Sequence, residues 1–301
     1  MTRPASHLTD RLTWNLAIAN LIAQIGIVVT GGLVRLTGSG LGCSSWPLCE
    51  PGNFTPVFHE EMTIHPIIEF GNRTLTGVLT VIAVWLLWAL YKREPVRNRP
   101  PILKGFGWAV LGGIGVQAIV GGISVLVELH PAMVGAHMSL SLVLIAISAY
   151  LVLRLRQEDV PAQRPRYPWL LWALALVSAV MMVLGTITTG TGPHSGDEET
   201  PYRFALDPVV ITRAHSLAVW AFVALLAVIV FLAVRNGEGI RRWRWVIGLT
   251  AAQGLVGYAQ YFNGLPILLV LLHMLLAAVL TAAITMAIAS NWERVPAHSA
   301  A

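Results

Sequence analysis

Four of the nine histidines fall within, or at the start of, long apolar stretches: His65, His137, His215 and His273. An ionisable side chain in such a stretch is costly and usually faces a partner or a cavity. The last three each lie about two turns into a predicted helix, so we expect them to share one depth. The remaining histidines lie in tails and loops, where we expect solvation.

A lone histidine of this kind is more often a packing residue than a ligand, but two of these three stand at equivalent positions of a sequence repeat. His215 and His273 can face each other across a helical bundle. Two imidazoles are the axial ligands that a six-coordinate, low-spin heme requires. Zinc or copper wants further ligands, and no other His or Cys is near. We therefore predict a bis-His heme at His215 and His273.

The N-terminal counterpart of this pair is incomplete. His137 faces a predicted helix that carries Asn72 and Glu69 where a second imidazole is expected. His65 precedes Asn72 by seven residues on the same helical face, about 10 Å nearer the surface. A heme held by His137 alone keeps one face open, which suits chemistry or exchange.

Glu69 and Arg73 allow two interpretations. Their i,i+4 spacing with the acid first favours an ion pair that makes the helix tolerable in an apolar setting. Alternatively, Glu69 faces the N-terminal site as a base or as a stabiliser of positive charge. Arg213 likewise either neutralises a heme propionate or reaches the outer interface.

The elements that position these residues are predicted to be transmembrane helices. The chain is 55% hydrophobic and only 12% charged, about half the charge of an average soluble protein. The apolar residues fall in runs of about 20, the length that crosses a hydrocarbon core. We expect eight spans, at 14–36, 66–90, 104–126, 132–154, 168–190, 208–233, 244–262 and 266–290.

The charge pattern predicts the orientation of these spans. Most of the 20 Lys and Arg residues lie in the two tails and in every second connection, while the intervening loops are acidic. This positive-inside pattern places both termini in the cytoplasm. A tract that binds nucleic acid would be contiguous, so we expect no nucleic-acid partner.

An internal repeat divides the chain. Gln117-Ala-Ile-Val-Gly121 matches Gln253-Gly-Leu-Val-Gly257, and His137-Met138 and His273-Met274 follow each Gln by 20 residues at one offset of 136. We therefore predict an all-α integral membrane protein built from two parallel-repeat four-helix bundles, residues 1–156 and 157–301.

The two cysteines, Cys43 and Cys49, lie in the first predicted outside loop, 37–65. Because that compartment is oxidising in bacteria, a disulfide is the leading interpretation. Metal binding by this pair is disfavoured, since no second Cys pair completes a four-ligand site.

One stretch resembles a known family. The run Thr30-Gly-Gly-Leu-Val-Arg-Leu-Thr-Gly-Ser-Gly-Leu-Gly-Cys43-Ser-Ser-Trp-Pro-Leu-Cys49, followed by Ile68-Glu69-Phe70 and Arg73, is similar to the heme A synthase family. Members have eight helices in two halves, which matches this chain from about residue 14 to 290. The resemblance implies an oxidoreductase that converts the C8 methyl of heme O to the formyl group of heme A, through a hydroxymethyl stage, for terminal oxidases.

The resemblance also implies where the groups bind. A permanent heme b belongs to His215 and His273, and the substrate heme O to the N-terminal half, with His137 as an iron ligand and Asn72, Arg73 and His65 nearby. Glu69 matches a glutamate implicated in the reaction. Many members have His at the position of Asn72, so this chain departs from the family there. Implied partners are heme O, heme A, heme O synthase, oxidase assembly factors and the lipid of the plasma membrane.

Two other functions fit part of the pattern. A membrane cytochrome b that only passes electrons to or from quinone would share the bis-His heme, but it should have two imidazoles in both halves. A parallel-repeat transporter would line a path with polar residues near the midplane, whereas here the polar residues gather at one depth near the outside. Both are less favoured than the synthase.

Overall fold

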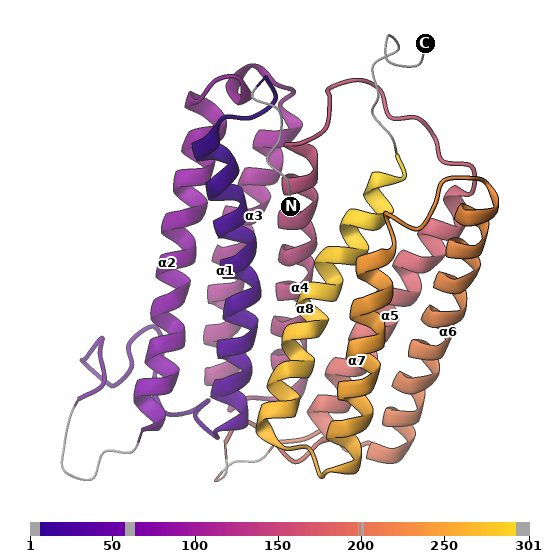
Figure 1. Cartoon of the computed structure of the whole chain (residues 1–301). Helices are drawn as coiled ribbons and strands as arrows, with labels where there is room; N and C mark the ends of the chain where they lie inside the picture. Colours follow the sequence, from indigo (N-terminus) through magenta and orange to yellow (C-terminus); the bar gives the residue numbers. More distant parts are fainter. Residues whose placement is uncertain (1–6, 58–63, 198, 200–201, 293–301) are drawn as a thin grey trace.

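The computed structural model describes residues 7–57, 64–197, 199 and 202–292, and within them the protein is helical (Figure 1). One short 3-10 helix, η1 (Val96–Asn98), joins α2 to α3. The long helices are α1 (Arg11–Leu36), α2 (His65–Lys92), α3 (Ile102–Leu126), α4 (Pro131–Arg154), α5 (Pro168–Thr191), α6 (Pro208–Arg235), α7 (Arg244–Phe262) and α8 (Ile267–Ser290). Every predicted span matches one of these helices to within three residues at each end.

Local sequence signals explain where several helices start. The carboxylate of Asp10 accepts hydrogen bonds from the first backbone N–H groups of α1, and Asp207 does the same for α6. These N-caps satisfy donors that have no partner within the helix. A proline stands in the first turn of α2, α4, α5 and α6, where its missing N–H costs nothing.

The helices run alternately up and down, which creates two distinct ends. We call the end with the α1–α2, α3–α4, α5–α6 and α7–α8 connections the loop end, and the opposite end the terminus end. In Figure 1 the loop end is at the bottom, and the start of α1 and the end of α8 are at the top.

Seven of the described helices are long and apolar enough to cross a membrane. The exception, α7, has 19 residues and carries Gln253 and Gln260. Large apolar side chains such as Leu217, Leu255 and Leu268 are 70–76% exposed, as expected for side chains that face lipid. The chain is therefore a multi-pass membrane protein: all eight predicted helices are present, and seven of them are long and apolar enough to be membrane spans.

The two sets of four helices pack differently. In the N-terminal set, α1 to α4 form a closed ring in which each helix contacts the next and α4 returns to α1. In the C-terminal set, α5 packs on α6 and α7 packs on α8, but α6 and α7 are not a closely packed pair. Between the sets, α4 packs on α8, α1 packs on α8 and α4 packs on α5.

A buried arginine joins the segments of the terminus end. Arg99 is only 8% exposed, and its guanidinium donates to the carbonyl oxygens of Leu8, Leu155, Arg154 and Gln157. It also donates to both carboxylate oxygens of Asp159, at 2.7 and 3.0 Å. Because a buried guanidinium must have partners, this network fixes the α4–α5 connection against η1 and the N-terminal segment.

Candidate functional site

One large cavity of about 1440 Å³ runs between the two sets of helices. Its volume exceeds the roughly 300–1,000 Å³ of ordinary small-molecule pockets. His137, His215, His273 and Asn72 all line it, so the structure brings together the three deep histidines and the residue opposite the first of them. Most of the wall comes from α5 to α8, where the gap between α6 and α7 leaves room.

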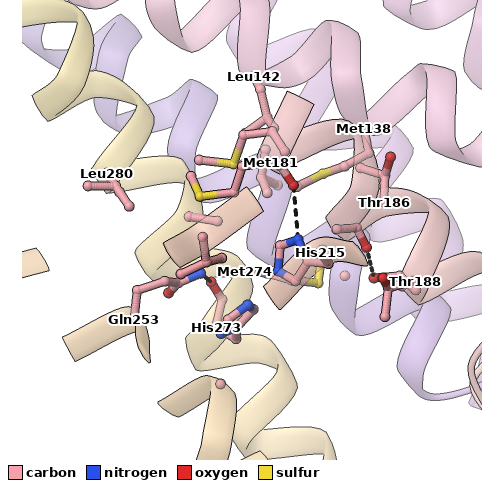
Figure 2. Close-up of a pocket in the computed structure, with 18 of the residues that line it drawn as sticks. Met138, Leu142, Met181, Thr186, Thr188, His215, Gln253, His273, Met274 and Leu280 are labelled. Atoms are coloured by element: carbon pink, nitrogen blue, oxygen red, sulfur yellow. Dashed lines mark hydrogen bonds between the residues drawn. The ribbon is translucent and has the colours of Figure 1, made fainter. Parts of the chain in front are cut away.

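His215 and His273 lie beside each other in this cavity (Figure 2). The Nδ1–H of His215 donates to the carbonyl oxygen of Met181 on α5, at 3.0 Å. That bond leaves Nε2 as the atom with a free lone pair, the usual arrangement for an imidazole that binds a metal. Nδ1 of His273 is buried and has no hydrogen-bond partner among the described residues.

Each of these histidines lies against a glycine of the preceding helix. A Cβ atom on Gly185 would lie 3.1 Å from Cε1 of His215, and one on Gly257 would lie 3.2 Å from Cε1 of His273. Contacts of this length are tighter than nearly all real Cβ contacts. The glycines therefore let α5 and α7 approach the imidazole rings closely.

The same pairing recurs in the N-terminal set. A Cβ on Gly121 would lie 3.1 Å from Cε1 of His137, and one on Gly31 would lie 4.0 Å from Nδ2 of Asn72. All four positions on the even-numbered helices, three His and one Asn, thus face a glycine on the preceding odd-numbered helix.

The repeated glutamines bind the backbone beside the histidines. Nε2 of Gln117 donates to the carbonyl oxygen of His137, and Nε2 of Gln253 donates to that of His273, each at 3.1 Å. These bonds fix the level of α3 against α4 and of α7 against α8. The 20-residue spacing in the sequence is the distance along the chain that brings each glutamine opposite its histidine.

The side-chain amide of Asn72 is hydrogen-bonded to the first helix. Thr30 Oγ1 donates to Asn72 Oδ1 at 2.7 Å, so the amide oxygen is engaged by α1. His65 is not among the residues that line the cavity; its Nδ1 lies 2.8 Å from Ser39 Oγ at the loop end. The structure therefore brings His137 and Asn72 together and leaves His65 apart from them.

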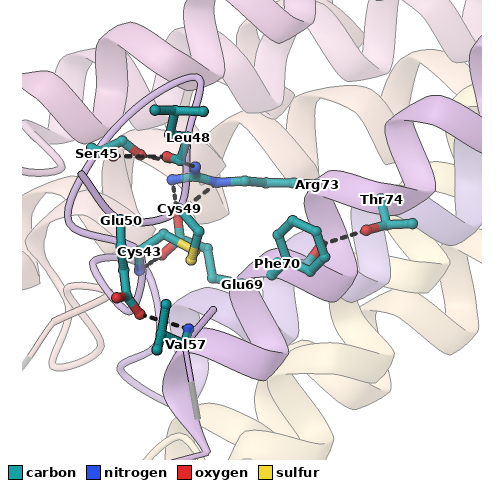
Figure 3. The surroundings of a disulfide bond; sticks show 10 residues. All are labelled: Cys43, Ser45, Leu48, Cys49, Glu50, Val57, Glu69, Phe70, Arg73 and Thr74. Atoms are coloured by element: carbon teal, nitrogen blue, oxygen red, sulfur yellow. Dashed lines mark hydrogen bonds and ion pairs between the residues drawn. A yellow bond between two sulfur atoms is a disulfide. The ribbon is translucent and has the colours of Figure 1, made fainter. Parts of the chain in front are cut away.

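Glu69 and Arg73 face the loop that contains both cysteines (Figure 3). Glu69 is 5% exposed, and its carboxylate accepts from the backbone N–H of Cys43 at 2.7 Å and from Nε of Arg73 at 3.0 Å. The predicted i,i+4 ion pair is confirmed. Neither residue is among those that line the cavity.

Arg73 also holds the loop itself. Its Nη1 donates to the carbonyl oxygens of Ser45 and Leu48 at 2.9 and 3.1 Å. The Sγ atoms of Cys43 and Cys49 lie 2.08 Å apart, and both cysteines are fully buried. Glu69 and Arg73 therefore anchor this loop to α2 through hydrogen bonds to its backbone.

The loop reaches the third helix through one aromatic side chain. The ring of Trp46 lies so close to Gly122 on α3 that a Cβ there would come within 2.3 Å of the indole. Gly122 follows Gly121, which seats His137. The loop thus covers the N-terminal ring of helices directly beside one of the deep histidines.

Comparison with known proteins places the chain in a family. The model of the cytochrome oxidase assembly protein family matches residues 14–197, more than half of the sequence. The chain belongs to the cytochrome oxidase assembly protein family. The match includes the cysteine loop, Glu69, Asn72 and His137.

Individual relatives of this family member are similar over most of their length. A heme A synthase from Rhizorhabdus wittichii is 27% identical, over 93% of this chain and 94% of its own. A heme A synthase from Lysinibacillus sphaericus is 26% identical, over 89% and 91%. Another, from a Bradyrhizobium species, is 27% identical, over 86% and 85%.

The cavity of this family member fits a large, flat, metal-containing ligand. In the described part of the chain, no three His, Cys, Asp or Glu side chains come together as a metal site, so His215 and His273 are a pair and not part of a larger cluster. A planar macrocycle that supplies four ligands of its own is the group that such a pair completes. The glycine seats and the mainly apolar wall suit a flat ring.

Sequence reasoning missed three features of this site. Gly185 seats His215, Met181 orients it, and Thr30 holds Asn72. The position of Gly185 could have been predicted from the repeat, because it lies six residues before the end of α5 and Gly257 lies at a similar place near the end of α7. The hydrogen bond from His215 to the Met181 backbone could not have been predicted, since any residue supplies a carbonyl oxygen.

Proposed function

We propose that this chain is a heme A synthase, which oxidises the C8 methyl of heme O to the formyl group of heme A, through a hydroxymethyl stage, for terminal oxidases. One observation carries the proposal: a single cavity contains His137, His215 and His273, in a chain that aligns with heme A synthases over about nine-tenths of its length. The histidines supply sites for a resident heme and a substrate heme.

The proposed architecture is eight membrane spans in two parallel halves, residues 1–156 and 157–301, with both termini in the cytoplasm of a plasma-membrane protein. The packing supports two equivalent halves, since α1 on α8 and α5 on α4 are corresponding contacts and α4 on α8 lies between them. The excess of Lys and Arg at the terminus end supports the orientation. The close packing of α7 on α8 supports its inclusion as the eighth span.

In the C-terminal half, His215 and His273 would hold the iron of heme b. Such a bis-imidazole heme supplies one-electron transfer. The Met181 carbonyl fixes the tautomer of His215, which keeps Nε2 available to the metal. Gly185 and Gly257 keep the two rings uncrowded.

In the N-terminal half, His137 positions the iron of the substrate heme O. Asn72 lines the same cavity, and Arg73 and His65 are proposed as further substrate contacts on the loop side, although neither lines the cavity. Asn72 is a poor iron ligand, so His137 would be the one strong protein ligand to the iron of the substrate. Such weak binding would suit exchange of heme O for heme A.

The long tail of heme O is proposed to leave the cavity through a neighbouring groove. This second groove, of about 620 Å³, lies among α4, α5 and α8, and Leu142 and Met182 line both spaces. Its wall is largely apolar, as an isoprenoid chain requires.

We propose Glu69 as the base or charge stabiliser for the methyl carbon; it lies one helical turn from Asn72 towards the loop end and outside the cavity wall. Its bonds to Cys43 and Arg73 couple that role to the cysteine loop, for which a disulfide is proposed. The test is Glu69→Gln, which keeps the acceptor for the Cys43 N–H. We expect heme A formation to fall at least about tenfold while heme b content is unchanged. A wild-type rate would remove Glu69 from the reaction, and Glu50→Gln, at a half-buried carboxylate of the same loop that accepts from the Val57 N–H, is the matched control.

The decisive experiment is extraction and chromatography of the hemes bound to the purified full-length protein. Heme b together with heme O or heme A is the expected result. Heme b alone, in a host that makes heme O, would instead indicate a membrane cytochrome, and a colourless protein would indicate transport.

A further inference from the structure

We propose that Arg35, Arg203 and Arg213 form a carboxylate-binding site at the loop end of the cavity, which binds the propionates of the heme held by His215 and His273. The inference rests on the proposed function and adds to it how the heme is oriented. Its first basis is charge: of the described residues that line the cavity, three are arginines and none is Asp or Glu. A ligand with negative charge at that end matches this wall.

Arg35 is held in a definite orientation. It is the second-last residue of α1, and its Nη2 donates to the carbonyl oxygen of Thr189 on α5 at 3.0 Å. Its Nε is buried and has no hydrogen-bond partner among the described residues. A guanidinium carries five N–H donors in a rigid plane, so one bond to a carbonyl orients the group and leaves donors for a carboxylate.

The other two arginines complete the same end of the cavity. Nη2 of Arg203, in the α5–α6 connection, donates to the carbonyl oxygen of Pro193 at 2.9 Å. Arg213 lies in the second turn of α6, two residues before His215. Within the described ranges none of the three forms an ion pair with a protein carboxylate. The nearby acid Asp207 is occupied with capping α6.

The helix register places this site one turn from the imidazoles. Gly185 lies against His215, and Thr189 follows Gly185 by four residues, about 6 Å along α5 towards the loop end. The guanidinium of Arg35, which binds the Thr189 carbonyl, therefore lies nearer the loop end than the imidazole of His215 does. A heme carries both propionates on one edge, so that edge faces the loop end and the opposite edge faces the apolar interior.

A simpler interpretation is that Arg35 only satisfies a free carbonyl near the end of α5. That explains the bond to Thr189. It does not explain the buried, unpaired Nε or why two further arginines line the same cavity without an acidic partner. Arg35 also belongs to α1, so this site would be assembled from both halves of the chain.

The test compares two probes that differ only in charge: ferric heme b and its dimethyl ester. The full-length protein is produced in a heme-deficient host, and each probe is titrated into it while the absorbance of the bis-imidazole complex is recorded. We expect the wild type to bind the diacid about 10- to 100-fold more tightly than the ester, because hydrogen bonds between charged groups have that strength. Arg35→Gln and Arg213→Gln should each remove about tenfold of this preference while ester binding is unchanged.

Arg235→Gln is the matched control, since Arg235 is an exposed arginine at the other end of α6. Arg35→Lys keeps the charge but not the planar fork, so it should retain part of the preference. The proposal is overturned if the wild type binds both probes equally, or if the arginine variants weaken both probes to the same extent. Should Arg35→Gln fail to fold, Arg203→Gln and Arg213→Gln carry the same comparison.

Failure of this proposal is distinct from failure of the proposed function. A protein that yields heme A on extraction but shows no preference for the diacid refutes the carboxylate site alone. A protein that prefers the diacid but contains neither heme O nor heme A refutes the synthase and leaves the carboxylate site supported.

Discussion

The two sets of four helices present similar side chains at one level and surround them differently. In the N-terminal set the helices close a ring, and the cysteine loop covers its end by placing Trp46 against Gly122. In the C-terminal set α6 and α7 stand apart, and arginines lie at the mouth of the resulting space.

The set of helices with more candidate heme ligands is the one that is packed less tightly. The set with two imidazoles, His215 and His273, has the wider gap between helices. The set with one imidazole, His137, has the tighter ring. This difference suggests that a resident heme fills the C-terminal space and becomes part of its packing, whereas the N-terminal site depends on a loop that covers it. Four predictions test this difference, beginning with the largest expected effect.

The first prediction removes both C-terminal imidazoles. The double variant His215→Ala and His273→Ala should lose nearly all of the heme b absorbance, because among the described residues of the cavity wall His137 is the one imidazole that would remain. Pyridine hemochrome assays and absorption spectra of the purified protein measure the loss. His7→Ala, at an exposed histidine of the terminus end, is the control and should keep its heme. A folded double variant with a full heme b spectrum would contradict the assignment.

The second prediction makes the N-terminal site resemble the C-terminal one. Asn72→His should add a second low-spin, bis-imidazole heme signal in electron paramagnetic resonance, because Gly31 leaves room opposite this position. The closed site should retain heme O longer and slow the turnover. Thr76→His places an imidazole on the same helix one turn further and should give no second signal. Unchanged spectra for Asn72→His would show that position 72 does not face the iron.

The third prediction concerns a substitution at Gly257, the glycine that lies against the His273 ring. Gly257→Ala should weaken heme b affinity by about tenfold, since its Cβ would lie 3.2 Å from the His273 ring and overpacking costs about 1–3 kcal/mol. Gly248→Ala is the control on the same helix, because no other atom lies within 4 Å of its Cβ position. Heme titration of both variants gives the ratio, and equal affinities would contradict a seat at Gly257.

The smallest expected effect concerns the terminus end, where Arg99 and Asp159 fix the connection between the halves. Burial alone would raise the pKa of the Asp159 carboxyl, but hydrogen bonds and charges from Arg99 and Arg154 outweigh it and hold the pKa below its ordinary value of 3.8. The unfolded chain therefore binds the proton more readily. The contribution of Asp159 to stability is complete above the ordinary pKa and is lost as the pH falls below it.

Thermal unfolding midpoints measured from about pH 6 to pH 3 test this prediction. The wild type should lose stability over the acid part of the range, and Asp159→Asn should lose less. Glu94→Gln removes an exposed ion pair with Arg97 and should behave like the wild type. An unchanged acid dependence for Asp159→Asn would show that the network does not depend on the charge.

The sequence was sufficient to locate the helices. Runs of apolar residues, prolines in first turns and the capping residues Asp10 and Asp207 are local signals, and they placed all eight helices within three residues. The gap between α6 and α7 was not predictable, because it depends on how whole helix faces fit. The polar residues of α7, Gln253 and Gln260, are consistent with this gap, but they do not predict it.

The site was predictable where position along a helix decides depth. His137, His215 and His273 were expected at one level, and all three line one cavity. Glu69 shows the limit of that reasoning. Its place on α2 did not reveal that its carboxylate binds the N–H of Cys43, because the path of a loop is not encoded in helical periodicity.

The position of α8 has a consequence for the biogenesis of the protein. This helix is synthesised after the other seven long helices that the structure describes, yet it packs against α1, α4, α5 and α7 and carries His273. Until it has been inserted, the cavity lacks a wall, and α7 lacks the helix on which it packs. The ribosome must therefore complete α8 before the cavity can bind a heme through both imidazoles, and truncation before α8 should yield a protein without heme b.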